Sequence, residues 1–245
     1  MTKTAYVLFA TVAYAIFFAS FLYLIAFVGD FLVPRTIDKG GSQTALGIAL
    51  IVNASLIALF GIQHSVMARQ GFKSAWTQIV PKPIERSLYV LSASAMLCLL
   101  YYFWHPIQGD IWRVENGIGA IVLWTLFGLG WIIVLASTFL INHFELFGLQ
   151  QVWRNLRGQA EAPIQFRKPL FYKLVRHPLY SGFLLAFWAT PHMTLGHMLF
   201  SVGMTVYILI AISYEEKDLV GYFGKDYQQY QQDVGMLVPG VGKGS

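Results

Sequence analysis

Charged and aromatic residues stand at both ends of one long apolar run. Arg176, His177 and Tyr180 precede the run, and Glu215 and Glu216 follow it. If the run folds as a hairpin, its ends meet, and the basic residues can face a glutamate. Adjacent helical residues point about 100° apart, so only one of the two glutamates needs to face inward.

A plain helix start is the alternative for this stretch. Pro178 biases His177 away from helical angles, and Tyr180 suits the aromatic belt of a membrane interface. Gly182 permits close packing of a neighbouring helix. A helix start does not explain why glutamates, Glu215 and Glu216, stand at the other end of the run.

A second polar set lies at residues 142–145. Asn142, His143 and Glu145 place an amide, an imidazole and a carboxylate within four residues, at the end of another apolar run. A solvated helix end capped by Gly148 explains part of this pattern. It does not explain the density of polar groups, each of which needs a partner or a function near a membrane interior.

Two further residues, His64 and Arg86, stand beside apolar runs. His64 lies eleven residues after Asn53, which puts both on one helix face, and we expect this face to be turned inward. His64 can serve as an ordinary hydrogen-bonding group at a helix interface. Arg86 lies one turn into its helix, where it would favour a carboxylate partner.

A metal site is not indicated. The chain has no His-Glu-x-x-His or paired His-x-x-x-His spacing. Its single cysteine, Cys98, lies inside an apolar run and excludes both an internal disulfide and a cysteine cluster.

The composition places all of these residues in a membrane protein. Of the 245 residues, 56% are hydrophobic and only 12% are charged, against roughly 25% charged in soluble domains. The net charge of +5 comes from Lys and Arg scattered between apolar runs. This scatter indicates membrane topology and not a nucleic-acid partner.

The apolar runs predict an all-α, polytopic integral membrane bundle with five to six transmembrane helices. A span needs about 20 apolar residues. A fifth region carries a break at Thr190-Pro191-His192, which predicts a tight C-terminal helical hairpin. If that hairpin is re-entrant, five helices span the membrane. The predicted runs are residues 5–33, 44–67, 84–104, 117–141 and 179–213.

Basic residues predict the orientation. Most of them fall in alternate segments between the runs, which places both termini and two long basic loops in the cytoplasm. We expect the bacterial inner membrane, with the active site on the cytoplasmic side. A single domain is expected to cover residues 1–245.

The C-terminal pattern resembles a known superfamily. Arg-His-Pro-x-Tyr-x-Gly, a hairpin and then Glu-Glu-x-x-Leu-x-x-x-Phe-Gly-x-x-Tyr-x-x-Tyr is similar to the signature of the isoprenylcysteine carboxyl methyltransferase and phospholipid methyltransferase superfamily. The resemblance implies S-adenosyl-L-methionine as methyl donor, bound by residues of about 142–230. In this chain the matching positions are Arg176 to Gly182, Glu215, Glu216, Leu219, Phe223, Gly224, Tyr227 and Tyr230.

Three other stretches resemble the membrane-bound methanethiol S-methyltransferases and the related NnrU-type proteins. They are Gln-His-Ser-Val-Met-Ala-Arg (63–69), Glu-Arg-Ser-Leu-Tyr-Val-Leu (85–91) and Asn-His-Phe-Glu-Leu-Phe-Gly-Leu (142–149). The resemblance implies a small thiol, methanethiol, as substrate and dimethyl sulfide as product. Membrane lipid is the other expected partner.

The resemblance also implies roles on the donor side. Glu215 and Glu216 would receive the ammonium or ribose of the donor. His177 and the backbone at Pro178 would bind its carboxylate or adenine edge, and Tyr180 would offer a ring face. Arg176 and Gly182 complete the expected cofactor site.

On the thiol side, a thiol with a pKa near 8.5 is mostly protonated at neutral pH. His64 and His143 are the candidate bases. Arg86 is expected to stabilise the thiolate, with Asn142 and Glu145 orienting their neighbours.

Three alternatives stay open at this stage. The acceptor could be a lipid amine or a prenyl-cysteine carboxylate. The chain could be a membrane reductase with a nicotinamide cofactor, because sterol-type reductases have a related C-terminal half. It could also be a non-enzymatic NnrU-like membrane protein whose polar groups line a cavity.

Overall fold

The computed structural model describes residues 2–42, 44–160 and 166–244. Five of its helices are long and apolar enough to cross a membrane, so the chain is an integral membrane protein. Short helices and a two-stranded sheet connect them. In chain order the elements are α1 (Lys3–Gly29), α2 (Leu46–Ala68), α3 (Gln70–Trp76), α4 (Lys82–Phe103), β1 (Asp110–Arg113), α5 (Gly117–Ile141), α6 (His143–Leu146), α7 (Leu149–Arg157), the 3-10 helix η1 (Leu170–Lys173), α8 (Pro178–Trp188), β2 (His192–Thr194), α9 (Leu195–Phe223) and α10 (Lys225–Asp233).

The predicted all-α membrane bundle is confirmed, and the C-terminal hairpin has unequal arms. Helix α8 has 11 residues and rises only about 16 Å at 1.5 Å per residue. This is about half of a hydrocarbon layer of ~30 Å. Helix α9 has 29 residues and is long enough to span. The lower predicted count, five spans with one short helix in the hairpin, is therefore the one that agrees with the structure.

The chain forms two compact units, each built from segments that are distant in the sequence. Unit 1 comprises Met1–Gly109, His143–Pro163 and Thr194–Phe200, and unit 2 comprises Asp110–Asn142, Ile164–Met193 and Ser201–Ser245. The single domain over residues 1–245 stays a prediction. Within the predicted donor-binding region, 142–230, residues 161–165 lie outside the described residues.

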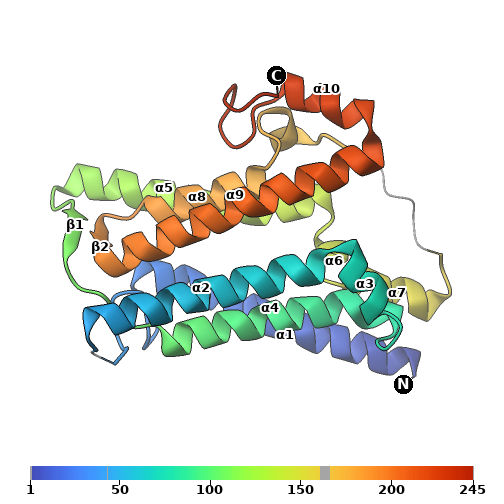
Figure 1. Ribbon diagram of the computed structural model, residues 1–245, viewed down its shortest axis with the longest axis horizontal. Coiled ribbons are helices and arrows are strands. Elements are labelled where there is room, and N and C mark those ends of the chain that lie inside the picture. The colour runs from blue at the N-terminus through green and yellow to red at the C-terminus, as the bar shows by residue number, and fades with distance from the viewer. Residues whose placement is uncertain (1, 43, 161–165, 245) are drawn as a thin grey trace. The chain divides into compact units, whose positions relative to one another are not determined.

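In unit 1, α4 packs against both α1 and α2 (Figure 1). Buried aromatic rings fill this bundle, with Trp104 and Phe200 meeting edge to face at 5.9 Å between centroids. The hydroxyl of buried Tyr101 donates to the carbonyl of Ser20 at 3.0 Å. The rings thus bury apolar area while their polar atoms keep partners.

The predicted inward face of α2 is confirmed. Asn53 is fully buried and makes two hydrogen bonds with the backbone of His105, one as donor at 2.7 Å and one as acceptor at 2.9 Å. His64, three turns later, contacts Tyr89 of α4. Both residues on this face therefore point toward α4 and the segment that follows it.

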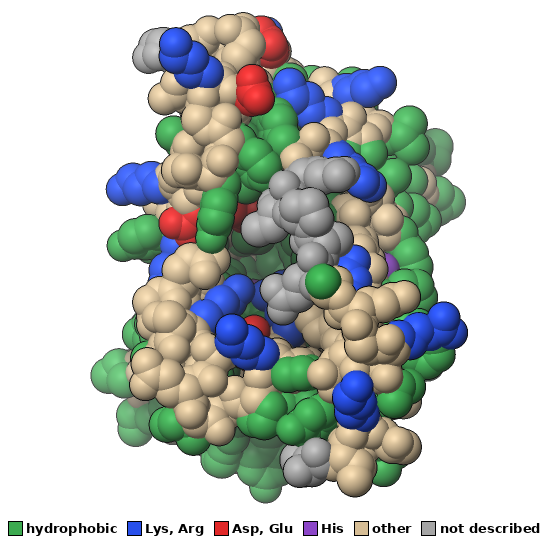
Figure 2. Space-filling view, turned by 90° about the vertical axis from the view of Figure 1, so that its right-hand side faces the viewer, with side chains coloured by type: hydrophobic (Ala, Val, Ile, Leu, Met, Phe, Trp, Pro, Cys, Tyr) green, Lys and Arg blue, Asp and Glu red, His purple; other side chains and the backbone are tan. Residues whose placement is uncertain are grey.

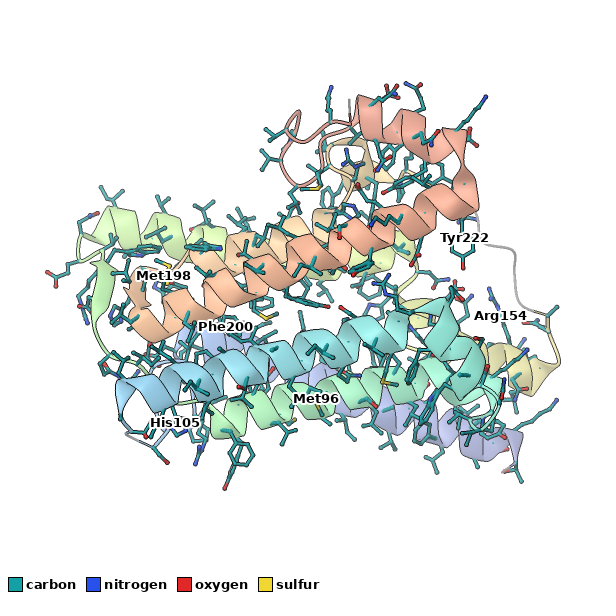
Figure 3. The ribbon with its side chains drawn as sticks, in the orientation of Figure 1. Met96, His105, Arg154, Met198, Phe200 and Tyr222 are labelled. Atoms are coloured by element: carbon teal, nitrogen blue, oxygen red, sulfur yellow. The ribbon has the colours of Figure 1, made fainter. Side chains whose placement is uncertain are left out.

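Basic side chains gather at one end of unit 1. Figure 3 labels His105 near the start of α2 and Arg154 on α7, at opposite ends of this unit. Charged side chains around the α7 end are mainly Lys and Arg, as the lower part of Figure 2 shows. This is the clustering that alternate basic segments predict. The basic residues of these segments are Lys3, Arg69, Lys73, Lys82, Arg86, Arg154 and Arg157.

In unit 2, α5 and α8 pack closely (Figure 1). A Cβ added at Gly130 would lie 2.7 Å from the carbonyl oxygen of Gly182, and one at Gly182 would lie 2.7 Å from that of Gly130. Only glycine allows the two backbones to approach this closely. The structure thus gives Gly182 a packing role, as the helix-start interpretation expects.

The Thr190-Pro191-His192 break forms the turn of the hairpin. The Trp112 indole N–H donates to the Thr190 carbonyl at 2.9 Å, and the Val114 N–H to that of Pro191 at 2.8 Å. On the helical side, the Ser201 hydroxyl donates to the Phe187 carbonyl at 2.8 Å. The turn is thereby tied to the β1 segment, and α8 to α9.

Candidate functional site

The start of α8 and the distal part of α9 meet in a buried ion pair. Nε of Arg176 lies 2.7 Å from Oε1 of Glu216, and Nε2 of His177 lies 3.0 Å from the same oxygen. Pro178 occupies the first turn of α8, where its missing N–H leaves no helix bond unmade. The predicted meeting of the two hairpin ends is confirmed for these side chains.

Glu216 is the glutamate that faces inward. Its side chain is 14% exposed, and its second oxygen accepts a hydrogen bond from Nε2 of Gln231 at 2.9 Å. The side chain of Glu215 is 45% exposed and only approaches Nδ1 of His177, at 4.0 Å. Glu216 therefore anchors the cluster, and Glu215 keeps a more open carboxylate. We call Arg176, His177, Glu215, Glu216 and Gln231 the Arg176 cluster.

Arg176 also ties the segment after α9 to the start of α8. Its Nη1 donates to the carbonyl oxygens of Gln231 at 3.0 Å, Val234 at 2.6 Å and Gly242 at 3.1 Å. Its main-chain N–H donates to the Gly235 carbonyl at 2.8 Å. With its side chain 3% exposed, Arg176 is an anchor for the residues that enclose the cluster. These carbonyl partners were missed, because main-chain acceptors carry no residue-type signal.

An open pocket of about 310 Å³ lies beside the cluster in unit 2. This volume is at the lower end of the range for small-molecule sites. The lining mixes a carboxylate, an ammonium, an amide and a hydroxyl with one apolar side chain. The lining residues are Ser213, Glu216, Lys217, Val220 and Gln231.

The two tyrosines of the C-terminal pattern, Tyr227 and Tyr230, are buried packing residues. The ring of Phe166 lies 5.5 Å from that of Tyr230, whose hydroxyl donates to the Tyr172 carbonyl. Burial raises the pKa of Tyr227, and it raises the pKa of Tyr230 to about 12. Both phenols thus stay protonated at neutral pH and hold α10 in place. Tyr180, by contrast, has its ring 5.8 Å from that of His177.

His64 and Arg86 belong to one connected group in unit 1. Nε2 of His64 lies 2.8 Å from the hydroxyl of Tyr89, and Cζ of Arg86 lies 4.8 Å from the centroid of the Tyr89 ring. Nε of Arg86 donates to the Leu146 carbonyl of α6 at 2.7 Å. In the described part of the chain, Arg86 thus pairs with a carbonyl and a ring and not with the carboxylate that the sequence favours.

His143, the first residue of α6, is buried among aromatic rings. The hydroxyl of Tyr14 lies 2.7 Å from its Nε2, and the Phe147 ring lies 4.8 Å from its own. Burial lowers the pKa of His143, which favours the neutral imidazole. A neutral, hydrogen-bonded imidazole is the form that can accept a proton.

A glycine lets α6 and α7 dock on α4. Gly148 has a φ of 87°, and a Cβ there would lie 2.4 Å from the Ser87 hydroxyl oxygen. Glu145 is exposed, and its main-chain carbonyl accepts from Nε2 of Gln151 at 2.9 Å. Asn142 ends α5 in unit 2, with its N–H donating to the Thr138 carbonyl at 3.2 Å. Within the dense 142–145 stretch, Asn142 thus belongs to unit 2, and His143 and Glu145 belong to unit 1.

The structure brings His64 and Arg86 together through Tyr89, which the sequence interpretation did not single out. Tyr89 follows Arg86 by three residues, so helical spacing alone could have placed the two side chains together. Tyr14 was also missed. It meets His143 across 129 positions, and no local pattern signals such a contact.

A separate ion cluster joins β1 to β2. Oδ1 of Asp110 lies 2.7 Å from Nε2 of His192, and Oδ2 lies 2.9 Å from Nε of Arg113. Hydrogen bonds from Arg113 and His192 lower the pKa of Asp110 to about 2. Across the described ranges, no three His, Cys, Asp or Glu side chains form a group that could hold a metal ion.

Comparison with known proteins adds a family and named relatives. Residues 52–238 match the family described as NnrU protein. The chain is 53% identical over 232 residues to "Methanethiol S-methyltransferase 1" of Bradyrhizobium diazoefficiens, covering 95% of this chain and 81% of that one. It is 49% identical over 239 residues to "Methanethiol S-methyltransferase" of Mycobacterium tuberculosis, covering 98% of each.

A more distant relative is "Nurim homolog" of Drosophila pseudoobscura pseudoobscura. It is 30% identical over 189 residues, which cover 74% of each chain. No solved structure matches this sequence.

Proposed function

Because this chain belongs to the NnrU protein family, we propose that it is a membrane methyltransferase that methylates methanethiol to dimethyl sulfide. One observation carries the proposal. About half of the residues are identical to those of proteins named methanethiol S-methyltransferase, over nearly the whole chain. This identity includes the first unit, where His64, Arg86, His143 and Glu145 of the candidate thiol residues lie.

We propose S-adenosyl-L-methionine as the methyl donor, held beside the Arg176 cluster. The residues there suit it. The volume of the pocket, about 310 Å³, lies within the range for small-molecule sites, and its lining offers Lys217 for a carboxylate and Ser213 and Gln231 for hydroxyl or amine groups. Glu215, whose side chain is 45% exposed, can receive an ammonium. When bound, the donor supplies a methyl group carried on a positively charged sulfur.

The other donor-side residues would hold the structure around the pocket. Glu216, held by Arg176 and His177, fixes the pocket wall more than it offers a free charge. Tyr180 can present a ring face to a cation. Pro178 starts α8, and Gly182 sets the distance between α8 and α5.

On the thiol side, His64 and His143 are the candidate bases. Each imidazole has a tyrosine hydroxyl within 2.8 Å of its Nε2. Removal of the thiol proton leaves a thiolate, the nucleophilic form of sulfur. Arg86 would stabilise that thiolate, and Glu145 and Asn142 would orient their neighbours. Such a small substrate offers few polar handles, so we expect size exclusion to set specificity.

We place the protein in the bacterial inner membrane with both termini and the active site facing the cytoplasm. The support is the gathering of Lys and Arg at the α7 end of unit 1, which holds Arg154 and Arg157.

The direct test supplies purified protein in lipid nanodiscs with methanethiol and methyl-labelled S-adenosyl-L-methionine. Labelled dimethyl sulfide in the headspace is expected. Label in the lipid fraction, with none in the headspace, would point to a lipid acceptor. Donor binding without any methyl transfer would favour a non-enzymatic role.

Donor binding has its own test. Glu216→Ala and His177→Ala should each weaken S-adenosyl-L-methionine binding by about tenfold or more. The first removes a carboxylate of the pocket lining, and the second removes a hydrogen-bond partner of that carboxylate. Asp226→Asn, an exposed carboxylate of α10, is the matched control. Unchanged dissociation constants in both cluster variants would contradict the donor site.

A further inference from the structure

Tyr89 stands between two residues that the proposed function assigns to the thiol. Its hydroxyl lies 2.8 Å from Nε2 of His64, and its ring centroid lies 4.8 Å from Cζ of Arg86. The tyrosine is 6% exposed. Because the three side chains come from the packed helices α2 and α4, a shift of Tyr89 would move both neighbours.

His64 and Arg86, the two residues on either side of Tyr89, each contact a further residue. The His64 ring stacks on that of Phe60, with centroids 5.3 Å apart. Nε of Arg86 donates to the Leu146 carbonyl at 2.7 Å. A continuous series of contacts therefore runs from α6 to α2, through Leu146, Arg86, Tyr89 and His64.

A hydrogen bond at one imidazole nitrogen fixes which nitrogen carries the proton and how the ring is turned. The Tyr89 hydroxyl engages Nε2 of His64. In the tautomer that suits a base, Nε2–H of His64 donates to the Tyr89 hydroxyl oxygen, which leaves Nδ1 to receive a proton arriving from a thiol. The Tyr89 oxygen would accept the Nε2–H of the imidazolium, and this bond strengthens when the donor is charged.

The second tyrosine–histidine pair has different surroundings. Tyr14 contacts His143 at 2.7 Å, and the rings nearest to that imidazole include Phe144 and Phe147. At the first pair, a guanidinium lies on the tyrosine ring. A thiolate forms more readily beside a cation, so the pair with His64 fits thiol activation better.

Resting on the proposed function, we infer that Tyr89 is a positioning residue that orients His64 as the base for methanethiol and holds Arg86 beside the thiolate. In this step the thiol proton passes from sulfur to Nδ1 of His64. The sulfur keeps the bonding electron pair as the thiolate. Tyr89 itself touches neither the thiol nor the donor.

A double-mutant cycle tests the inference with the full-length protein in nanodiscs. Tyr89→Phe is expected to lower kcat for dimethyl sulfide by about tenfold and His64→Ala by about 100-fold, the range for a general base. Both should leave the dissociation constant of S-adenosyl-L-methionine unchanged. Because Tyr89 acts through His64, the double variant should be no slower than His64→Ala.

Tyr102→Phe is the matched control. Tyr102 lies at the other end of α4, and there Cζ of Arg35 lies 4.5 Å from its ring centroid. The control removes the hydroxyl of another α4 tyrosine whose ring contacts an arginine. This variant should keep wild-type kcat. If Tyr89→Phe does not fold, Tyr89→Leu removes both the hydroxyl and the ring beside Arg86, so its loss of kcat should be at least as large as that expected for Tyr89→Phe.

Two results would overturn the inference alone: wild-type kcat in Tyr89→Phe, or an equal fold-loss from Tyr89→Phe in the wild-type and His64→Ala backgrounds. The second result would indicate a merely structural effect. Wild-type protein that makes no dimethyl sulfide would overturn the proposed function and this inference with it.

Discussion

Arg176 and Glu216 form a buried ion pair between residues 40 positions apart. Removing one partner of such a pair leaves the other charge buried without compensation, which costs several kcal/mol. Glu215 is adjacent in sequence but has a side chain that is 45% exposed, and a solvated charge contributes little to stability. The two neighbouring glutamates should therefore differ sharply when they are replaced.

We predict that Glu216→Ala lowers the free energy of unfolding by about 3 kcal/mol. Glu215→Ala, the matched control, should change it by less than about 0.5 kcal/mol. Chemical unfolding in detergent micelles measures both values. Equal losses in the two variants would show that the ion pair is not what stabilises the hairpin ends.

The ion cluster of Asp110, Arg113 and His192 predicts that the stability of the protein depends on pH. The pKa of Asp110 falls from 3.8 to about 2 in the folded protein, through hydrogen bonds from Arg113 and His192. A carboxyl whose folded pKa is depressed adds stability above its unfolded pKa and loses it as the pH falls to the folded one. The loss should therefore occur between about pH 4 and pH 2.

Thermal unfolding over this pH range is the measurement. The midpoint of the wild type should fall more steeply than that of Asp110→Asn, which has lost the titrating group. Asp226→Asn is the control for removal of a surface carboxylate. Parallel curves for wild type and Asp110→Asn would contradict the prediction.

A side-chain contact could be predicted from the sequence when both partners belong to one local motif, such as a hairpin. The pairing of Arg176 and His177 with a glutamate follows from the ends of one hairpin. The contact of His143 with Tyr14 does not, because it joins positions far apart in the sequence and depends on how α1 packs. The same holds for Asn53, whose partner is the backbone of His105.

At the scale of elements, Gly130 and Gly182 let α5 and α8 touch backbone to backbone. We predict that Gly130→Ala lowers the free energy of unfolding by about 1–3 kcal/mol, the cost of overpacking a tight contact. Gly128→Ala is the control, because no atom lies within 4 Å of the added Cβ there. Equal stability of the two variants, measured in the same micelles, would count against close packing.

The long helices could be predicted from sequence because crossing the membrane fixes both their length and their apolar content. The short ones could not. Helices α3, α7 and α10 have seven to nine residues, and helices this short form only when tertiary packing supports them. Val152 of α7, for example, is 1% exposed and packs with Ala10 and Ile84.

At the scale of the whole molecule, the proposed orientation predicts which loops face which side. In a Cys98→Ser background, Glu115→Cys should react with a membrane-impermeant maleimide in intact spheroplasts. Gln159→Cys should react only after permeabilisation. Both positions are exposed, so access is set by the membrane and not by burial.

The reverse labelling pattern would invert the topology and place the candidate residues outside the cytoplasm. Reaction of both positions in intact spheroplasts would indicate leaky cells, which a cytoplasmic marker enzyme detects. The sequence supports this prediction through alternating basic segments alone, because length and hydropathy are the same for either orientation of a helix.

The carbonyl partners of Arg176 at Gln231, Val234 and Gly242 come after all five long apolar helices of the described residues. During synthesis, Arg176 leaves the ribosome while these residues are still untranslated. The Arg176 guanidinium therefore lacks these acceptors until the residues that follow α9 have been made. The donor side of the protein is thus completed only after the last membrane segment has been translated.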